Sequence, residues 1–243
     1  LTSQTGFKSF YCNDCTDKLD YYTSEWKKLG FQPDGIYTGF LSSEKQVDKI
    51  LDFINSFETE NTLVLVDPVM GDGGRTYSLF TDALACKMKK LVTVADVITP
   101  NLTECCILCD VDYCEFIKNA DKPDFLDKIA ELGKNLLNRY GVKIVIITGI
   151  EHKDIDGTMY VQNLIASKDE VFSVSCKKIG GSYSGTGDLF ASVMFSGLLR
   201  GDTLRDTVSL AVKFIETSLR DTVALGIDRN EGIEFEKHLK ILL

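Results

Sequence analysis

The segment Gly185-Thr186-Gly187-Asp188 combines a glycine-rich turn with a carboxylate, two features suited to phosphate chemistry. Its glycines allow a tight backbone turn that exposes successive amide groups. Apolar residues at helical spacing follow, beginning with Leu189, Phe190 and Val193, so the turn is predicted to open a helix. Amides at a helix N-terminus bind phosphate oxygens. Asp188 would accept a proton from an attacking hydroxyl group there, or would serve only as a helix cap.

A second set of polar residues stands where four predicted strands end. Each follows a short apolar run, and glycine or proline comes within a few residues: Thr38, Asp67, Thr99 and Thr148. Ligands of open α/β sheets bind beyond the carboxyl ends of the strands. We therefore expect these residues to share one edge with Asp72, Glu104 and the turn at 185–188. Carboxylate oxygens there would hold Mg²⁺, and backbone amides would hold phosphoryl oxygens.

The pair Asn101-x-x-Glu104 also has a simpler interpretation. It matches a capping box, in which Asn101 caps a helix and Glu104 reaches back to the Asn101 amide. The sequence leaves both the capping box and the metal site open. Other chemistries are poorly supplied, because the chain has no G-x-x-x-x-G-K-[ST] loop, no G-x-G-x-x-G and no G-x-S-x-G motif.

Composition narrows the class of protein. The net charge of −9 argues against non-specific binding to nucleic acid or to anionic membranes. Cys12 and Cys15 form one C-x-x-C pair and Cys106 and Cys109 another, which a zinc site could use. Buried thiols are the alternative that we favour, because free cysteine is usually a small buried apolar residue. Abundant thiols without a secretory signal indicate the cytoplasm.

Apolar periodicity predicts the elements that must position these residues. Buried strands alternate with helices, which predicts a mostly parallel sheet with helices on both faces. Strands are predicted at 35–40, 62–66, 97–99 and 143–149, with a hairpin or irregular strand pair at 157–175. A flexible loop is predicted at 70–75. Helices are predicted at 14–29, from 43 onward, at 78–92, after 101, and at 124–140, 188–199, 203–223 and 231–242.

Three motifs together resemble the pyridoxal kinase branch of the ribokinase superfamily. They are Asp-Pro-Val-Met-Gly-Asp at 67–72, Thr-Pro-Asn-Leu-Thr-Glu at 99–104 and Gly-Thr-Gly-Asp-Leu-Phe at 185–190. The resemblance runs along the whole chain and implies one kinase domain over 1–243 with a three-layer α/β/α ribokinase-like fold. It also implies transfer of the ATP γ-phosphoryl group to the hydroxymethyl group of pyridoxal, pyridoxine or pyridoxamine.

The resemblance assigns roles to individual residues. Asp188 would be the catalytic base, and Gly185, Thr186 and Gly187 the anion hole. Asp67 and Glu104 would act on Mg²⁺, with Glu104 acting through water. Residues placed near ATP are Asp72, Tyr77, Asn101, Thr148 and Gly149. Residues placed near the vitamer ring are Gln4, Thr5 and Phe40. The family also implies a homodimer, and a monovalent cation such as K⁺ is a further expectation.

The chain departs from the family pattern in places. Many relatives carry His where this chain has Gln4, and Tyr where it has Phe40. The similarity begins after the family's opening strand–helix–strand unit, so we expect this chain to lack that segment. Hydroxymethylpyrimidine kinase is the nearest alternative, although members of that branch often carry Cys where this chain has Asp188. A non-catalytic protein that binds the vitamer or the nucleotide is the alternative from another class.

Overall fold

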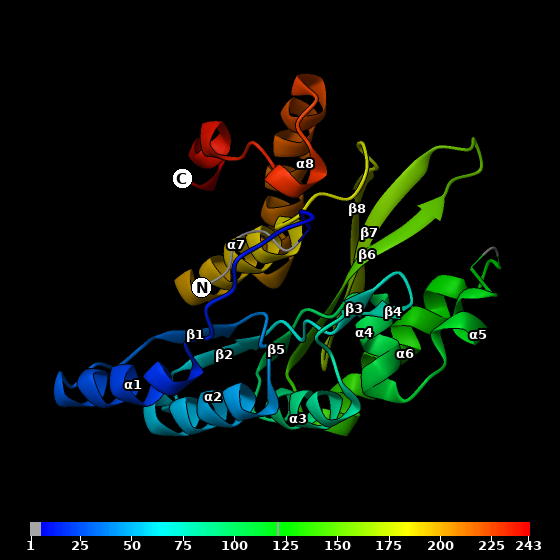
Figure 1. Cartoon of the computed structure of the whole chain (residues 1–243). Helices are drawn as coiled ribbons and strands as arrows, with labels where there is room; N and C mark the ends of the chain where they lie inside the picture. The colour runs from blue at the N-terminus through cyan, green and yellow to red at the C-terminus, as the bar shows by residue number, and fades with distance from the viewer. Residues whose placement is uncertain (1–5, 121) are drawn as a thin grey trace. The chain divides into compact units, whose positions relative to one another are not determined.

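The computed structural model describes residues 6–120 and 122–243 and contains a six-stranded sheet with flanking helices (Figure 1). The strands lie in the order β1-β2-β5-β6-β7-β8. Their bounds are Gly35–Thr38 for β1, Leu63–Val66 for β2, Val97–Ile98 for β5, Ile144–Lys153 for β6, Met159–Ser167 for β7 and Val171–Lys177 for β8. The predicted α/β class is confirmed.

Strands β1, β2, β5 and β6 pair in parallel, as predicted. Their apolar residues are almost wholly buried, and Val64, Ile98 and Val145 have no exposed surface. Such continuous apolar runs are typical of strands covered on both faces. β7 is antiparallel to β6, and Figure 1 shows the two as a long pair of strands. The sheet is therefore mostly parallel, with an antiparallel addition that begins at β7.

The chain divides into two compact units, Lys28–Ser175 and the combination of Leu1–Lys27 with Cys176–Leu243. The helices of the first unit are α2 (Glu44–Phe57), α3 (Asp82–Val92), α4 (Leu102–Cys109), α5 (Tyr113–Ile117) and α6 (Phe125–Tyr140). Ser43 caps α2 by accepting from the Gln46 amide, and Gly141 ends α6 in the left-handed conformation. Both boundaries follow the sequence signals of helix caps.

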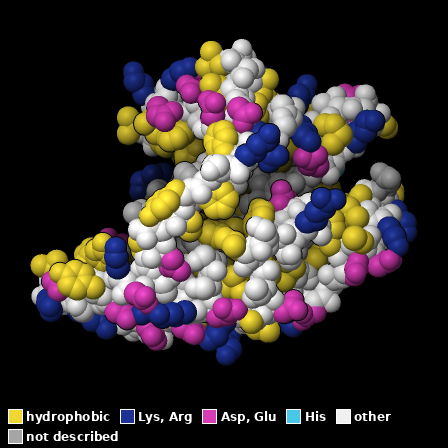
Figure 2. Space-filling model, viewed as in Figure 1, with side chains coloured by type: hydrophobic (Ala, Val, Ile, Leu, Met, Phe, Trp, Pro, Cys, Tyr) yellow, Lys and Arg dark blue, Asp and Glu magenta, His cyan; other side chains and the backbone are white. Residues whose placement is uncertain are grey.

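The second unit contains α7 (Thr186–Arg200) and α8 (Leu204–Leu225), which pack closely. A Cβ atom on Gly197 would lie 2.7 Å from the Thr207 hydroxyl, so a larger residue would separate the helices. Helix α1 (Leu19–Lys28) has no buried residue, and Figure 2 shows hydrophobic side chains gathered over it. Its large side chains Tyr22 and Trp26 are thus exposed.

Several predicted boundaries were wrong. The loop at 70–75 forms a small hairpin, β3 (Gly71–Asp72) and β4 (Arg75–Thr76), because Gly73 and Gly74 both take positive φ and permit a tight turn. Helix α3 begins at Asp82, after a Thr81 cap, rather than at 78. Helix α1 begins only at Leu19, after the 3-10 turn Thr16–Lys18.

The predicted α-helix at 231–242 is also wrong. It is replaced by two 3-10 turns, Arg229–Glu231 and Glu236–Leu242. Gly232 lies between them at φ 89° and ψ −157°, a backbone conformation that only glycine adopts readily and that cannot continue a helix. Among the described residues, every helix is too short or too polar to cross a lipid bilayer.

Candidate active site

The polar residues at the strand ends of the first unit share one edge of the sheet. The Asp67 amide at the end of β2 donates to the Thr38 carbonyl oxygen at 2.8 Å, and the Thr99 amide donates to the Val66 carbonyl oxygen at 3.3 Å. All three side chains are buried, with Asp67 9% exposed. The predicted convergence of Thr38, Asp67 and Thr99 is confirmed.

Glu104 joins this edge through the start of α4. Its Oε1 atom accepts from the Met70 amide at 3.0 Å, and its Oε2 atom accepts from the Asn101 amide at 2.8 Å. The Asn101 Oδ1 atom accepts from the Glu104 amide at 3.1 Å, which completes the capping box. Asn101 also donates through Nδ2 to the Gly71 carbonyl oxygen at 2.7 Å. The capping box therefore exists, and it fixes Glu104 at the strand ends at the same time.

We call Thr38, Asp67, Thr99 and Glu104 the strand-end cluster. Burial, and secondly the charge of Asp67, raise the pKa of Glu104 to about 8, although hydrogen bonds from backbone amides oppose this. Glu104 is only 3% exposed. Ionisation of such a carboxyl group beside another carboxylate is unfavourable, and a nearby cation would favour it.

The chemistry of this cluster fits Mg²⁺. This ion prefers oxygen ligands and is usually held by one or two carboxylates together with waters and substrate phosphates. The Thr38 and Thr99 hydroxyl groups are buried without a hydrogen-bond partner among the described residues. Buried polar groups normally find a partner, and metal-bound water would supply one. Asp67 and Glu104 are the residues that would hold the ion.

The small hairpin β3–β4 carries Asp72 beside this cluster. A Cβ atom on Gly71 would lie 2.3 Å from the Arg75 carbonyl oxygen, so the hairpin requires glycine there. The Gly74 amide donates to the Thr103 hydroxyl at 2.9 Å, and the Tyr77 amide donates to the Met70 carbonyl oxygen at 3.0 Å. The Asp72 side chain is exposed, and its Oδ1 atom accepts from the Gly73 amide.

Thr148 and Gly149 reach the same region from β6. Thr148 forms an isolated parallel bridge with Asn101, and its amide donates to the Pro100 carbonyl oxygen at 2.9 Å. Gly149 has φ 69°, and its amide donates to the Oδ1 atom of Asn163 on β7 at 3.3 Å. Asn163 was not predicted from the sequence. The signal that could have found it is the polar pair Gln162-Asn163 inside an otherwise apolar strand.

In the second unit, Gly185–Asp188, which we call the glycine turn, opens α7. Gly185 is the N-cap in the left-handed conformation, at φ 81°, so Asp188 does not occupy the N-cap position. The Thr186 hydroxyl donates to the Tyr183 carbonyl oxygen at 3.0 Å, and the Leu189 amide donates to the Gly185 carbonyl oxygen at 3.0 Å. The first amides of a helix have no partner within it, which suits an anion.

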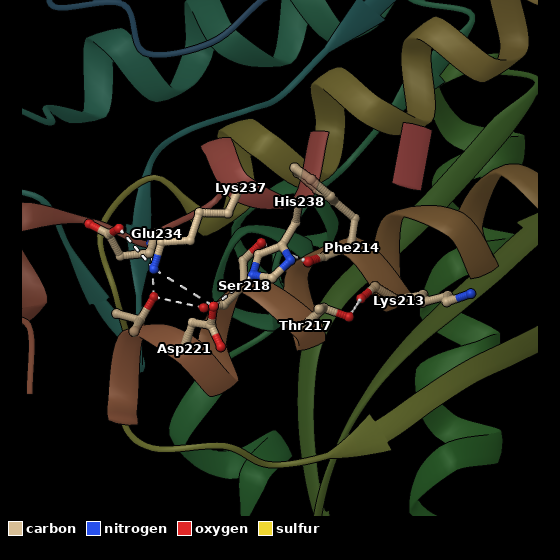
Figure 3. Close-up of polar contacts among 9 residues, drawn as sticks. Lys213, Phe214, Thr217, Ser218, Asp221, Glu234, Lys237 and His238 are labelled. Carbon is tan, nitrogen blue, oxygen red and sulfur yellow. Dashed lines mark hydrogen bonds and ion pairs between the residues drawn. The ribbon is translucent and has the colours of Figure 1, made fainter. Parts of the chain in front are cut away.

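Asp188 lines a cavity of ≈ 350 Å³ in the second unit. The cavity wall consists of Ser184, Gly185, Asp188, Leu189, Ile227 and residues 231–236. Glu234 is tied to α8, because its amide donates to the Thr222 hydroxyl at 2.9 Å. His238 Nε2 lies 3.1 Å from Asp221 Oδ2, and Lys237 Nζ lies 3.7–3.8 Å from carboxylates of Glu234 and Asp221 (Figure 3). These contacts tie Glu234, a residue of the cavity wall, to α8 and to the C-terminal 3-10 turn.

For the residues predicted to contact the vitamer ring, the structure provides fewer observations. Phe40 lies two residues beyond β1 and is 49% exposed, a surface that a planar ring could cover. Gln4 and Thr5 lie outside the described residues. Within residues 6–120 and 122–243, no three His, Cys, Asp or Glu side chains form a group that could hold a metal ion, and the cysteines are free thiols.

Comparison with known proteins identifies relatives. The family model described as phosphomethylpyrimidine kinase matches residues 27–232. A provisionally assigned pyridoxal kinase of Schizosaccharomyces pombe is 30% identical over 171 residues, which cover 69% of this chain and 47% of that protein. This chain thus spans about half the length of that relative.

Two solved structures have the same fold. A provisionally assigned phosphomethylpyrimidine kinase of Bacteroides thetaiotaomicron, solved with pyridoxal, has a TM-score of 0.87 and 36% identity, covering 98% of this chain and 80% of that chain. Pyridoxal kinase of Lactobacillus plantarum has a TM-score of 0.83 and 24% identity, covering 98% of this chain and 81% of that chain. The predicted ribokinase-like architecture is therefore confirmed.

Proposed function

This chain belongs to the phosphomethylpyrimidine kinase family, and we propose that it phosphorylates the hydroxymethyl group of a B6 vitamer: pyridoxal, pyridoxine or pyridoxamine. The observation that carries this proposal is the strand-end cluster, in which buried Glu104 and Asp67 lie close enough for the charge of Asp67 to raise the pKa of Glu104. The similarity to a structure solved with pyridoxal favours a vitamer as the acceptor.

The proposed reaction is a direct phosphoryl transfer. The hydroxymethyl oxygen forms a bond to the γ-phosphorus of ATP, and the bond from that phosphorus to the β,γ-bridging oxygen breaks to release ADP. The Asp188 carboxylate accepts the hydroxyl proton. Amides of the glycine turn stabilise charge on the transferring phosphoryl oxygens, because catalysis of this reaction rests mainly on positioning and charge stabilisation.

The first unit would receive the metal and the nucleotide. Mg²⁺, when bound at Asp67 and Glu104, would neutralise charge on the ATP phosphates. Both oxygens of Glu104 already accept backbone hydrogen bonds, so contact with the ion through water fits this residue. Asp72, Tyr77, Asn101, Thr148 and Gly149 are the proposed nucleotide contacts. Gln4, Thr5 and Phe40 are the proposed contacts of the vitamer ring.

Hydroxymethylpyrimidine is the alternative acceptor, and the description of the matching family favours it. Its ring is also flat and also carries a hydroxymethyl group, so the same base and the same anion hole would serve. The two proposals differ only in the ring that the enzyme accepts. They share the nucleotide, the metal and the mechanism.

One assay separates these activities. The protein is incubated with ATP and Mg²⁺ and with each of four acceptors: pyridoxal, pyridoxine, pyridoxamine and hydroxymethylpyrimidine. Mass spectrometry of the products should show a phosphate added to at least one vitamer, and EDTA should abolish it. Turnover of hydroxymethylpyrimidine alone would replace the first proposal by the second. Binding of a vitamer or ATP by calorimetry, with no ADP released from any mixture, would establish the non-catalytic alternative.

Three further expectations remain predictions. Light scattering after size exclusion would test the homodimer. Replacing KCl by choline chloride at constant ionic strength would test the requirement for a monovalent cation. Cell fractionation would test the cytoplasmic location.

A further inference from the structure

The antiparallel pairing of β6 with β7 contains a β-bulge between Ile147 and Ile150. Ile147 pairs with Leu164, and Ile150 pairs with Gln162, so Thr148 and Gly149 together stand opposite the single residue Asn163. A bulge of this kind removes the extra residues from the ladder and redirects the bulged strand. The bulge falls on the two residues of β6 that we place at the nucleotide.

The bulge leaves the Gly149 amide without its ladder partner, and Asn163 replaces that partner. The Oδ1 atom of Asn163 accepts from the Gly149 amide at 3.3 Å. Asn163 is only 8% exposed, whereas Gly149 is exposed, and one hydrogen bond of this kind contributes about 0.5–1.5 kcal/mol. Gly149 has φ 69°, which L-amino acids with side chains adopt only with strain. The glycine permits this backbone conformation, and the asparagine holds it.

The bulge determines which segment the Thr148 backbone pairs with. Instead of continuing the ladder with β7, Thr148 pairs with Asn101 and donates its amide to the Pro100 carbonyl oxygen at 2.9 Å. Asn101 belongs to the capping box that fixes Glu104. A continuous set of hydrogen bonds and strand pairings therefore runs from Asn163 through Gly149 and Thr148 to the residue beside the metal ligands.

We propose that Asn163 is a positioning residue for the nucleotide, an inference that rests on the proposed kinase function. Asn163 acts through the bulge, by keeping Gly149 in the left-handed conformation and Thr148 against Asn101. The vitamer contacts proposed above lie on other segments, near Phe40 and at the N-terminus of the chain. The effect of Asn163 should therefore fall on ATP and not on the vitamer.

The test compares Asn163→Ala with Gln162→Ala. Gln162 is the neighbouring residue of β7, is equally buried at 6% exposed, and points to the opposite face of the sheet because side chains alternate along a strand. We expect Asn163→Ala to raise KM for ATP and the calorimetric Kd for ATP about tenfold, the size expected for one lost hydrogen bond. KM for pyridoxal should stay within twofold. Gln162→Ala should leave both KM values within twofold, even where it lowers Tm.

Gly149→Ala is the second variant, needed if Asn163→Ala does not fold. A Cβ atom on Gly149 would meet nothing within 4 Å, so this substitution changes only the preferred backbone conformation. It should reproduce the selective loss of ATP affinity.

The outcomes separate failure of the proposed kinase function from failure of the role proposed for Asn163. Wild-type protein that binds no ATP would overturn the proposed function and this inference with it. Wild-type protein that binds ATP, with Asn163→Ala and Gly149→Ala binding it equally well, would overturn this inference alone. An equal rise of both KM values would also overturn it, because it would show a purely structural role for Asn163.

Discussion

The strand-end cluster and the glycine turn, to which we assign the binding of phosphate charge, are built in opposite ways. In the cluster, the carboxylates are buried and both oxygens of Glu104 accept backbone amides. In the turn, Gly185, Gly187 and Asp188 are exposed, and the N-cap residue Gly185 makes no side-chain hydrogen bond to the first amides of α7. Burial costs free energy that exposure does not. Substitutions in the cluster should therefore affect stability and activity together. Substitutions in the turn should affect activity alone.

The largest expected effect comes from Asp188→Asn. Asparagine cannot accept the hydroxyl proton, and loss of a general base typically lowers the rate by roughly 10²–10⁴. We expect turnover to fall at least about a hundredfold, within that range, with ATP binding retained and Tm nearly unchanged. Steady-state kinetics, calorimetry and thermal denaturation measure the three quantities.

The matched control is Asp206→Asn. Asp206 occupies the third helical position of α8, as Asp188 does in α7, and is also exposed. Its replacement should leave turnover within twofold. Turnover of Asp188→Asn within a few-fold of wild type would show that Asp188 only supports its helix.

The next largest effect is expected from Glu104→Gln, which should lower both the stability and the activity of the protein. Glutamine offers one oxygen to the two amides of Met70 and Asn101, so one buried amide loses its acceptor at a cost of about 1–3 kcal/mol. Residues that support a metal ion typically contribute 10–100-fold to its affinity or to activity. We expect the Mg²⁺ concentration for half-maximal turnover to rise by about that factor, together with a lower Tm.

Glu115→Gln provides the control for this variant. Glu115 stands at the third position of α5, after the Asp112 cap, but is exposed and pairs with Lys118. It should change neither the Mg²⁺ dependence nor Tm appreciably. If Glu104→Gln behaved like Glu115→Gln, the capping box would be the whole role of Glu104.

A pH series sharpens the comparison further. The pKa of Glu104 is raised from 4.5 to about 8, so between these values the folded state holds a proton that the unfolded state releases. Stability contributed by this group is present below pH 4.5 and is lost as the pH rises through about 8. We expect the free energy of unfolding without Mg²⁺ to fall by up to about 1.4 kcal/mol per pH unit across this window. Urea denaturation from pH 5 to pH 9 measures the slope.

The slope should flatten in Glu104→Gln, which has no proton to release. Because a cation favours the ionised carboxylate, Mg²⁺ with ATP should raise Tm more at pH 8.5 than at pH 6. A slope that is identical in wild type and Glu104→Gln would place the titration on another group.

The smallest expected effect lies at the C-terminal end of α4. Asp110 ends that helix in the left-handed conformation, at φ 58°, and its carboxylate pairs with Lys89 and Arg139, which lower the pKa of Asp110. Asp110→Ala should lower the free energy of unfolding by about 1–2 kcal/mol, because alanine tolerates this conformation poorly. Asp110→Asn should cost less, since asparagine adopts it more readily and exposed ion pairs contribute little. Activity should be unchanged in both.

Much of the fold could be predicted because its signals are local. Runs such as Leu63–Val66 indicated buried strands, and Ser43, Asn101 and Gly141 indicated helix boundaries through contacts with residues at most four positions away. The site motifs were recognisable for the same reason, since each lies within six consecutive residues. The order of the parallel strands then brought Thr38, Asp67 and Thr99 to one edge, as a parallel sheet requires.

Other features depend on residues far apart in the sequence, and only the tertiary structure decided them. The hairpin at 71–76 depends on the backbone of 71–74 meeting Asn101 and Thr103, some thirty residues away. Burial of Glu104 beside Asp67 raises its pKa, although its spacing from Asn101 indicates no more than a capping box. The role of Asn163 arises from a pairing with Gly149 across two strands. Hydrogen bonds within a helix turn follow from spacing, whereas desolvation and register exist only once distant segments pack together.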